Sequence, residues 1–374
     1  MKVVIVNCFD TYEDRIDLLH DFFINKNHDV TVIQSDFRHF KKVKRTEKKK
    51  DFIFVGSKPY YKNISVTRMI SHYDYAKKAF QFVEDMQPDL LYVMVPPNSL
   101  AKFAADYKRK HSNVKLIFDL IDLWPETMPI GKIKILPPFN FWKSMRDKNL
   151  KFADYVITEC DLYKEVLKKQ LKGIKAETVY LAQREVNINS HPVCSNNKIH
   201  LCYLGSINNI IDIPKIKMLV KSINEIKPVT LHIIGDGESK NVLIDEIKST
   251  GATVEYHGKI YNPQKKQDIF DKCQFGLNIM KDTVCIGLTM KSIDYFQAGL
   301  PIINSIEADT AEIVNKYKIG INVTDENTED VATKVANFDI EELLIMEENT
   351  YKLFSNLFSV EAFNKKLQNI IEKL

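Results

Sequence analysis

Residues 287–301, Gly-Leu-Thr-Met-Lys-Ser-Ile-Asp-Tyr-Phe-Gln-Ala-Gly-Leu-Pro, are the most informative segment of the chain for its fold. They follow an apolar run at 275–279 that is typical of a buried strand, and their pattern predicts a helix that begins near Thr289 and ends at the glycine before Leu-Pro. A helix that begins at the carboxyl end of a strand points its free N–H groups and the positive end of its dipole at that edge of the sheet, which suits an anion. Lys291 adds a positive charge there, and Asp294 lies one turn further on the same face.

The position of Asp294 predicts a role for its carboxylate. With a rise of 1.5 Å per residue, it lies roughly 5–8 Å beyond the start of the helix. That distance suits the ribose of a nucleotide whose diphosphate is held at the helix start, because a carboxylate can accept hydrogen bonds from both ribose hydroxyls. A capped amphipathic helix with a solvated Lys–Asp pair explains the same residues, and the residues alone leave both interpretations open.

The rest of the chain alternates short apolar runs with amphipathic helical stretches. This alternation predicts an α/β fold of two doubly wound Rossmann-like domains that face each other across a cleft, with ligands at the carboxyl ends of the strands. The expected domains are residues 1–182, a polar linker at 183–198, residues 199–339, and helices at 340–374 that can pack back on the first domain. Expected strands are 3–6, 30–33, 52–55, 90–95, 115–118, 155–158, 178–181, 199–204, 230–234, 253–256, 275–279, 301–304 and 321–323, and helices are expected at 65–86 and 100–111.

The composition is that of a globular protein without membrane spans. Of the 374 residues 45% are hydrophobic and 27% are charged, and the longest apolar run, 90–97, has only the length of a strand. The first six residues form a strand-like run that is too short for the core of a signal peptide. The six cysteines include no Cys-x-x-Cys pair. We therefore expect a cytoplasmic protein with reduced thiols and no structural zinc site.

The charge is distributed unevenly between the two halves. Residues 1–182 hold 32 Lys and Arg against 23 Asp and Glu, whereas residues 183–374 hold 21 against 26. The first half is thus expected to prefer an anionic partner, such as a lipid phosphate or the inner face of the membrane. A solvated loop is the commonest meaning of its densest basic run, but we favour peripheral membrane contact, worth up to about 1 kcal/mol per residue near the surface. The run consists of Arg38, Lys41, Lys42, Lys44, Arg45, Lys48, Lys49 and Lys50.

Three segments resemble GT-B glycosyltransferases of the GT4 type, in particular those of bacterial capsular polysaccharide and exopolysaccharide synthesis. Residues 287–301 resemble their donor-binding signature, Asp122-Leu-Trp-Pro-Glu126 is similar to a second marker, and residues 60–72 resemble their acceptor domain. The resemblance implies transfer of a hexosyl unit from a nucleotide-sugar, expected to be UDP-linked, to a saccharide or an undecaprenyl-diphosphate-linked saccharide. It also implies retention of the anomeric configuration and no metal or other cofactor. The positions that match the donor signature are Lys291, Asp294, Tyr295, Ala298, Gly299 and Pro301.

The resemblance also implies the residues of each site. Lys281 and Lys291 are expected to stabilise the departing diphosphate, and Asp122 is expected to contact the sugars or to act as acceptor base. The first half is expected to bind the acceptor, because carboxylates beside an indole ring suit a sugar. The expected acceptor residues are Arg15, Arg68, His72, Trp124 and Glu126. The expected nucleotide-sugar residues are Gly205, Ser206, Gly235, Gly258, Lys259, Gly287, Leu288, Thr289, Met290, Lys291 and Asp294.

Two departures from the family pattern keep other functions open. Ile286 stands where many members have the first of two glutamates, and no arginine occurs beyond Arg184. A non-catalytic GT-B subunit that binds sugar or nucleotide is therefore the main alternative, and a UDP-sugar 2-epimerase is the next. The sequence has no Asp-x-Asp triplet, which argues against metal-dependent transfer of the single-domain type, and no module for binding nucleic acid. His257 is expected to be a packed or solvated histidine.

Overall fold

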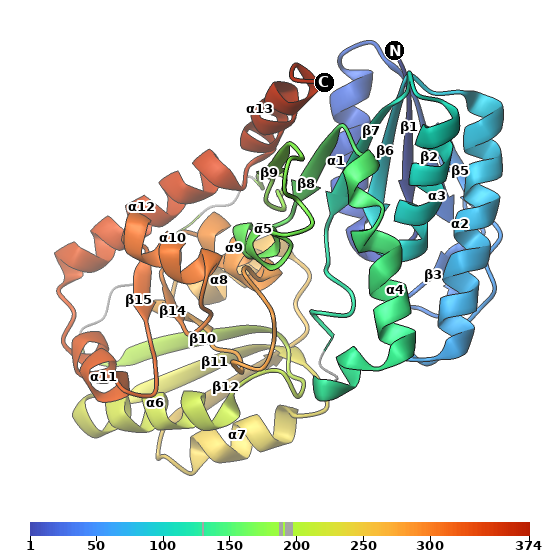
Figure 1. The fold of residues 1–374 in the computed structure, drawn as a ribbon. Coiled ribbons are helices and arrows are strands. Elements are labelled where there is room, and N and C mark those ends of the chain that lie inside the picture. Colours follow the sequence, from blue (N-terminus) through green and yellow to red (C-terminus); the bar gives the residue numbers. More distant parts are fainter. Residues whose placement is uncertain (129–130, 187–189, 191–196) are drawn as a thin grey trace. The chain divides into compact units, whose positions relative to one another are not determined.

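The computed structural model describes residues 1–128, 131–186, 190 and 197–374. The chain forms two compact units (Figure 1). Unit 1 comprises Met1–Leu181 and Phe363–Leu374, and unit 2 comprises Ala182–Ala362. The predicted linker at 183–198 lies in large part outside the described residues, as does Cys194, and no disulfide joins the cysteines that are described. In the described parts of the chain, no helix is both long and apolar enough to cross a membrane.

Unit 1 is built on a parallel seven-stranded sheet with the order β5-β2-β1-β6-β7-β8-β9. Its strands are β1 Lys2–Asn7, β2 Asp29–Ser35, β5 Phe52–Val55, β6 Leu90–Val95, β7 Lys115–Leu120, β8 Tyr155–Thr158 and β9 Ala176–Thr178. Its helices are α1 Glu13–Ile24, α2 Val66–Met86, α3 Asn98–Lys110, α4 Pro137–Asp147, α5 Asp161–Val166 and the greater part of α13 Val360–Ile371. The predicted strands are found except that the last lies two to three residues earlier than 178–181.

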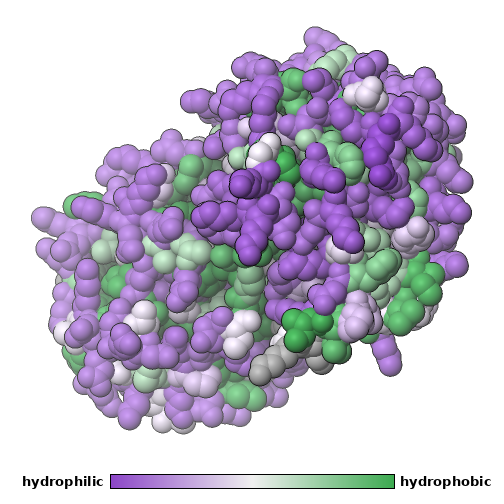
Figure 2. Space-filling model, viewed as in Figure 1, coloured by the Kyte–Doolittle hydropathy of each residue, from purple (hydrophilic) through white to green (hydrophobic). Residues whose placement is uncertain are grey.

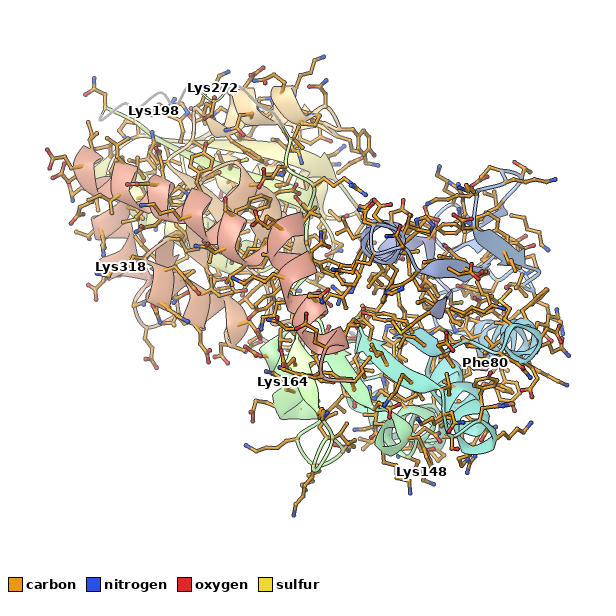
Figure 3. All side chains as sticks on the ribbon, turned by 90° about the horizontal axis from the view of Figure 1, so that it is seen from above. Phe80, Lys148, Lys164, Lys198, Lys272 and Lys318 are labelled. Atoms are coloured by element: carbon orange, nitrogen blue, oxygen red, sulfur yellow. The ribbon has the colours of Figure 1, made fainter. Side chains whose placement is uncertain are left out.

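The core of unit 1 lies between this sheet and its helices. All six residues of β6 are buried, which explains why its sequence is apolar without alternation. The helix α2 begins where Ser65 accepts a hydrogen bond from the backbone N–H of Arg68, as an N-cap does. Phe80 of α2 packs into the core, whereas Lys148 projects from the surface (Figure 3).

The basic run at 38–50 differs from the predicted loop. It contains two short antiparallel strands, β3 Phe37–Arg38 and β4 Val43–Lys44. Several of its cations also have acidic partners within unit 1: Arg38 and Arg45 contact Glu47, Arg45 contacts Glu13, Lys44 contacts Asp36 and Lys49 contacts Asp17. Much of its charge is therefore neutralised internally, which weakens the prediction that this run attracts a membrane.

Unit 2 has a parallel six-stranded sheet with the order β12-β11-β10-β13-β14-β15. Numbered along the unit, this order is 3-2-1-4-5-6, that of a dinucleotide-binding Rossmann fold. Its strands are β10 Ile199–Ser206, β11 Val229–Asp236, β12 Thr253–Gly258, β13 Phe275–Asn278, β14 Ile302–Asn304 and β15 Gly320–Asn322. Its helices are α6 Ile213–Ile226, α7 Lys240–Lys248, α8 Pro263–Phe270, α9 Met290–Gln297, α10 Asp309–Tyr317, α11 Thr328–Ala336 and α12 Ile340–Leu357.

The predicted fold class of two doubly wound Rossmann-like domains is confirmed. The C-terminal helices divide between the units, because α12 packs in unit 2 whereas residues from Phe363 onward belong to unit 1. There the Lys373 ammonium contacts the Glu177 carboxylate, and the Arg15 guanidinium lies 5.4 Å from the centre of the Phe363 ring.

Candidate nucleotide site and acceptor residues

The strand order of unit 2 places a candidate site between β10 and β13. In an open parallel sheet, ligands bind outside the carboxyl ends of the strands, where successive strands turn to opposite sides. In unit 2 this point lies between β10 and β13. The loop after β10 and the start of α9 both reach it, since the side chain of Lys291 in α9 approaches Gly205 at the end of β10.

Glycines let the loops after β10 and β11 pack directly on one another. A Cβ atom on Gly235 would lie 1.9 Å from the carbonyl oxygen of Gly205, and one on Gly237 would lie 2.3 Å from that of Ile207. Gly205 and Gly235 also have positive φ angles of 119° and 146°. At Gly235 and Gly237 no other residue type fits without displacing backbone, and the positive φ angles of Gly205 and Gly235 also favour glycine. The exposed Ser206 follows Gly205, so both predicted residues lie on this edge of the sheet.

The start of α9 agrees with the sequence prediction. Thr289 is the N-cap, and its Oγ1 accepts a hydrogen bond from the backbone N–H of Ser292 at 3.3 Å. The same hydroxyl donates to Oδ1 of Asn278 at 2.9 Å. Asn278, Asn304 and Asn322 are paired residues of β13, β14 and β15, and their amides bond in series at 2.9 and 2.8 Å. This asparagine ladder fixes the cap to three strands.

The segment before the cap is anchored to α10. Thr310 donates from its backbone N–H and from Oγ1 to the Gly287 carbonyl, at 3.0 and 2.6 Å. Leu288 is buried, and Met290 is 47% exposed at the first position of the helix. The predicted residues 287–290 thus form a fixed entry to α9, with Met290 available to a ligand.

Lys291 lies within the site and has no acidic partner among the described residues. Its Nζ lies 4.6 Å from the centre of the Tyr203 ring and 3.6 Å from the sulfur of Met280, and no carboxylate of the described residues is within 4 Å. Burial lowers the pKa of Lys291 to about 7. Since burial disfavours the charged form, an anion placed near this ammonium would raise its pKa again.

The other predicted lysines lie at the surface of the same edge. The Lys281 ammonium donates to the Asn209 carbonyl at 2.7 Å, which ties the loop after β13 to the loop after β10. Lys259 lies 3.8 Å from a carboxylate oxygen of Asp236 and its side chain is 58% exposed. Gly258, just before it, has a φ of 68° and open space where a Cβ would stand.

Asp294 does not pair with Lys291. Its Oδ1 lies 2.9 Å from Nζ of Lys266 in α8. The solvated Lys–Asp pair within α9 that the sequence allows is therefore not formed. The ion pair uses only Oδ1 of Asp294, and the Asp294 side chain is 25% exposed, so Oδ2 can accept a hydrogen bond from a ligand.

The remaining signature residues hold α9 in place. The Tyr295 hydroxyl donates to the Cys202 carbonyl at 3.1 Å and accepts from the Leu204 N–H at 2.7 Å, so it fastens α9 to β10. Gly299 ends the helix with a φ of 70°, and a Cβ there would lie 2.2 Å from the Tyr351 ring. Ile286 packs against the core of unit 2, which is why this position holds an apolar residue.

In unit 1, Asp122 and Trp124 are joined within one loop. The indole Nε1 of Trp124 donates to Oδ2 of Asp122 at 2.7 Å, and the Thr127 hydroxyl donates to the other oxygen. Burial raises the pKa of Asp122, although these hydrogen bonds act in the opposite direction. A carboxyl group with a raised pKa next to an aromatic ring can act in proton transfer or bind a hydroxyl group.

Arg68 and His72 lie against the same indole. The Arg68 guanidinium is 4.2 Å from the centre of the Trp124 ring, and the His72 ring stacks on it at 5.9 Å. Arg68 has no carboxylate partner among the described residues, and Nε of Arg68 and Nδ1 of His72 are buried without a hydrogen-bond partner. The structure therefore brings four predicted residues together, with Arg68 as the cation.

The other two predicted acceptor residues have internal partners. Arg15 is buried and bonds both oxygens of Asp119, at 2.7 and 3.0 Å, as well as the carbonyls of Val179 and Tyr180. Glu126 accepts two hydrogen bonds from the buried Arg146, at 2.7 and 3.1 Å. Burial would raise the pKa of Glu126, but the hydrogen bonds and charge of Arg146 together with the hydrogen bond from Lys143 outweigh it, and the pKa is lowered. Both side chains thus have a structural role in unit 1, and their contact with an acceptor stays a prediction.

The comparisons with known proteins agree with this architecture. Residues 198–338, most of unit 2, match the family described as glycosyl transferases group 1. A comparison with curated protein sequences gives no match. Sucrose-phosphate synthase from Thermosynechococcus elongatus is 12% identical with a TM-score of 0.73, over 100% of this chain and 99% of that chain.

Two further solved structures align with this chain over 100% of its length and 100% of their own. HepE of Anabaena, in complex with UDP, is 13% identical with a TM-score of 0.71. The apo form of WaaB, a lipopolysaccharide outer core galactosyltransferase, is 15% identical with a TM-score of 0.68. The chain thus has the GT-B fold of glycosyltransferases, and its C-terminal unit matches the group 1 family.

Proposed function

We propose that this protein transfers a hexosyl unit from a UDP-sugar to a saccharide on a lipid diphosphate carrier, in the synthesis of a cell-surface polysaccharide. Unit 2 binds the donor and unit 1 binds the acceptor. The family match of unit 2 supports glycosyl transfer, and the resemblance of residues 287–301 to GT4 signatures supports the narrower assignment.

The observation that carries the proposal is the environment of Lys291. A half-buried ammonium without a carboxylate partner lies beside Gly205, at the start of a capped helix. The helix dipole and the ammonium both favour an anion there. The diphosphate of UDP lies at this point in our proposal, with Lys281 at the rim, and Asp294 one turn deeper accepts from the ribose hydroxyls.

In this proposal the chemistry needs little from protein acids and bases. The donor's own phosphate takes the proton from the acceptor hydroxyl as the sugar is transferred with retention and without a metal. Lys291 and the N–H groups at the start of α9 stabilise the charge that develops on the departing diphosphate. Asp122 and Trp124 position the acceptor sugar, and Arg68 pairs with an anionic group of the acceptor.

A groove in unit 1 supports a lipid-linked acceptor at the membrane. It has a volume of about 750 Å³ between α2 and α4, and its lining includes Val66, Ile70 and Phe141, which are 71%, 51% and 63% exposed. Figure 2 shows apolar side chains gathered in this part of the surface. Lys58 and Lys77 also line it. The groove can therefore bind an apolar lipid chain through its apolar side chains and an anionic headgroup through these lysines.

The groove connects to the predicted acceptor residues. Trp142 of α4 lines it and also contacts Trp124, with ring centres 5.6 Å apart. This continuity favours membrane contact through α2 and α4 rather than through the basic run at 38–50.

A panel of nucleotides and nucleotide-sugars in a thermal-shift assay tests the donor assignment. A ligand that binds only the folded state raises the melting temperature (Tm). We expect UDP and at least one UDP-sugar to raise it in the wild type, and Lys291→Ala and Asp294→Ala to abolish most of the rise. Met218→Ala on α6 serves as a matched control. Undiminished UDP binding by both site variants would disprove the central assignment.

The second candidate function is a non-catalytic GT-B subunit that binds nucleotide or sugar. Ile286 favours it, because an apolar side chain packed on the core cannot replace an acid that contacts the donor sugar. Such a subunit would bind UDP-sugars without turning them over.

A further inference from the structure

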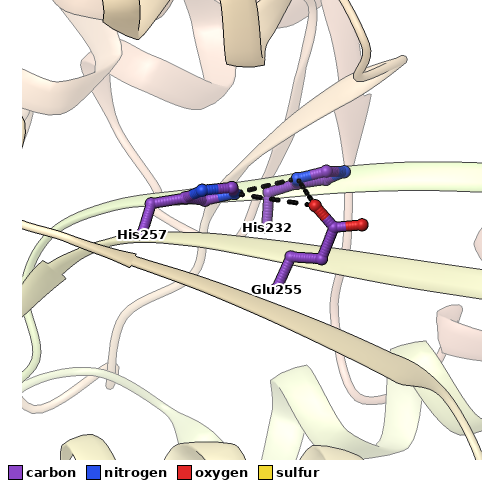
Figure 4. Close-up of side chains that lie close together, drawn as sticks. All are labelled: His232, Glu255 and His257. Carbon is purple, nitrogen blue, oxygen red and sulfur yellow. Dashed lines mark hydrogen bonds and ion pairs between the residues drawn. The ribbon is translucent and has the colours of Figure 1, made fainter.

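A cluster of metal-ligating side chains lies on the edge of the sheet in unit 2. His232 is in β11, and Glu255 and His257 are in the edge strand β12. Figure 4 shows the two imidazole rings end to end with the Glu255 carboxylate beside the gap between them. His232 is buried, whereas 48% of the Glu255 side chain and 22% of the His257 side chain are exposed, so an ion can enter from solvent.

An irregularity in β12 lies at the cluster. His232 pairs with Glu255 and Ile233 with Tyr256, but Ile234 pairs with Gly258, so His257 is an extra residue opposite this step. In a regular strand, His257 would be the partner of Ile234. A bulge inserts one residue and turns its side chain, a device frequent at sheet edges and near functional sites. Here His257 is the extra residue, and Nε2 of its imidazole lies 3.1 Å from Nδ1 of His232.

The distances suit a tetrahedral ion. Nδ1 of His232 lies 3.1 Å from Nε2 of His257 and 3.4 Å from Oε2 of Glu255, and the third distance, from His257 to Glu255, is 4.0 Å. Ligand atoms bound at 2.0–2.1 Å to a tetrahedral zinc ion lie about 3.3 Å apart. Two distances agree to within 0.2 Å, and the half-exposed Glu255 can close the third.

A fourth side chain orients the buried ligand. Nδ1 of His200 in β10 lies 2.9 Å from Nε2 of His232. If His232 donates its Nε2 proton to His200, its Nδ1 lone pair is left for a metal, as in sites where a second group fixes the ligand tautomer. Neutral imidazole is the form that binds metals.

We propose that His232, Glu255 and His257 bind a divalent transition-metal ion of the Zn²⁺ type. Three protein ligands leave one coordination position for water. The ion crosslinks the edge strand β12 to β11 immediately before Gly258 and Lys259, and thereby fixes the loop that follows β12. Its role is structural and separate from the transfer chemistry proposed above. In the sequence, the only indication of this metal site is that Glu255 and His257 lie on one face of a strand.

Metal titrations of the full-length protein test this site. With the protein stripped by EDTA, one equivalent of Zn²⁺ is expected to bind, and an excess of 100 times the dissociation constant should raise the Tm of unit 2 by roughly 5–10 °C. Co²⁺ should give the visible absorption of a four-coordinate ion with imidazole and carboxylate ligands. His257→Gln should abolish both signals, and Glu255→Gln should weaken the affinity at least about 10-fold.

The matched control is His111→Gln, which breaks a His–Glu pair of 2.9 Å on the surface of unit 1 and should leave binding unchanged. The half-exposed Glu255→Gln variant keeps the test valid if His257→Gln fails to fold. The proposal is overturned if the wild type shows no metal-dependent shift, or if both site variants bind Zn²⁺ as the wild type does. UDP binding is a separate readout, so either result leaves the donor assignment untouched.

Discussion

The lowered pKa of Lys291 predicts how UDP binding depends on pH. In the free protein this lysine loses its charge as the pH rises through about 7. A bound diphosphate stabilises the ammonium and returns its pKa toward the ordinary value of about 10.4. The protein must therefore take up a proton to bind UDP above neutral pH, and its affinity for UDP falls as the pH increases.

The size of this effect follows from the two pKa values. With a free pKa of 7 and a bound pKa of about 10.4, the dissociation constant rises by about 50-fold between pH 7 and pH 9, or about 2.3 kcal/mol. Above pH 7 the terminal phosphate of UDP, with a pKa near 6, is already ionised and adds little to the dependence.

Isothermal titration calorimetry at half-unit pH steps measures this curve, and buffers of different ionisation enthalpy count the protons taken up. Lys291→Arg is the matched variant, because a guanidinium stays charged over the whole range, and its affinity should change less than about 3-fold. A flat curve for the wild type, or an equally steep one for Lys291→Arg, would refute the role assigned to Lys291.

Three further predictions concern stability. Lys291→Met should raise the Tm of the ligand-free protein below pH 7 while it abolishes UDP binding, because the folded state no longer holds an unpaired, half-buried cation; a lower Tm would contradict this. Gly235→Ala should cost at least about 3 kcal/mol in urea unfolding, since its Cβ would meet a backbone oxygen at 1.9 Å, whereas Gly258→Ala, with open space, should cost only about 1 kcal/mol. Glu126→Gln should destabilise unit 1 by about 2 kcal/mol through Arg146; lost activity at unchanged stability would instead support Glu126 as an acceptor contact.

Local features of the site were predictable from the sequence. The cap at Thr289, the helix after it and the glycine that ends it depend on neighbouring residues, and the structure has all three. The parallel sheets could also be anticipated, since alternating strands and helices favour them.

Ion-pair partners that are distant in the sequence could not be predicted. Arg15 resembles an anion-binding residue until β7 brings Asp119, 104 positions away, against its guanidinium. Glu126 likewise meets Arg146 only once α4 has packed. Conversely, the sequence could not predict that Lys291 has no carboxylate partner. Asp294 is within reach of it in α9, but its carboxylate pairs with Lys266 instead.

The most direct test of the proposed function is a transfer assay with radiolabelled UDP-hexoses and a lipid extract that contains diphosphate-linked saccharides. Purified full-length protein is incubated with EDTA, and labelled lipid is separated from labelled donor. The proposal predicts that label enters the lipid fraction with one UDP-hexose, and that Lys291→Ala reduces the rate by at least about 100-fold. A protein that binds UDP-hexoses in the thermal-shift assay but neither transfers nor hydrolyses any of them would contradict it and would identify a non-catalytic binding subunit.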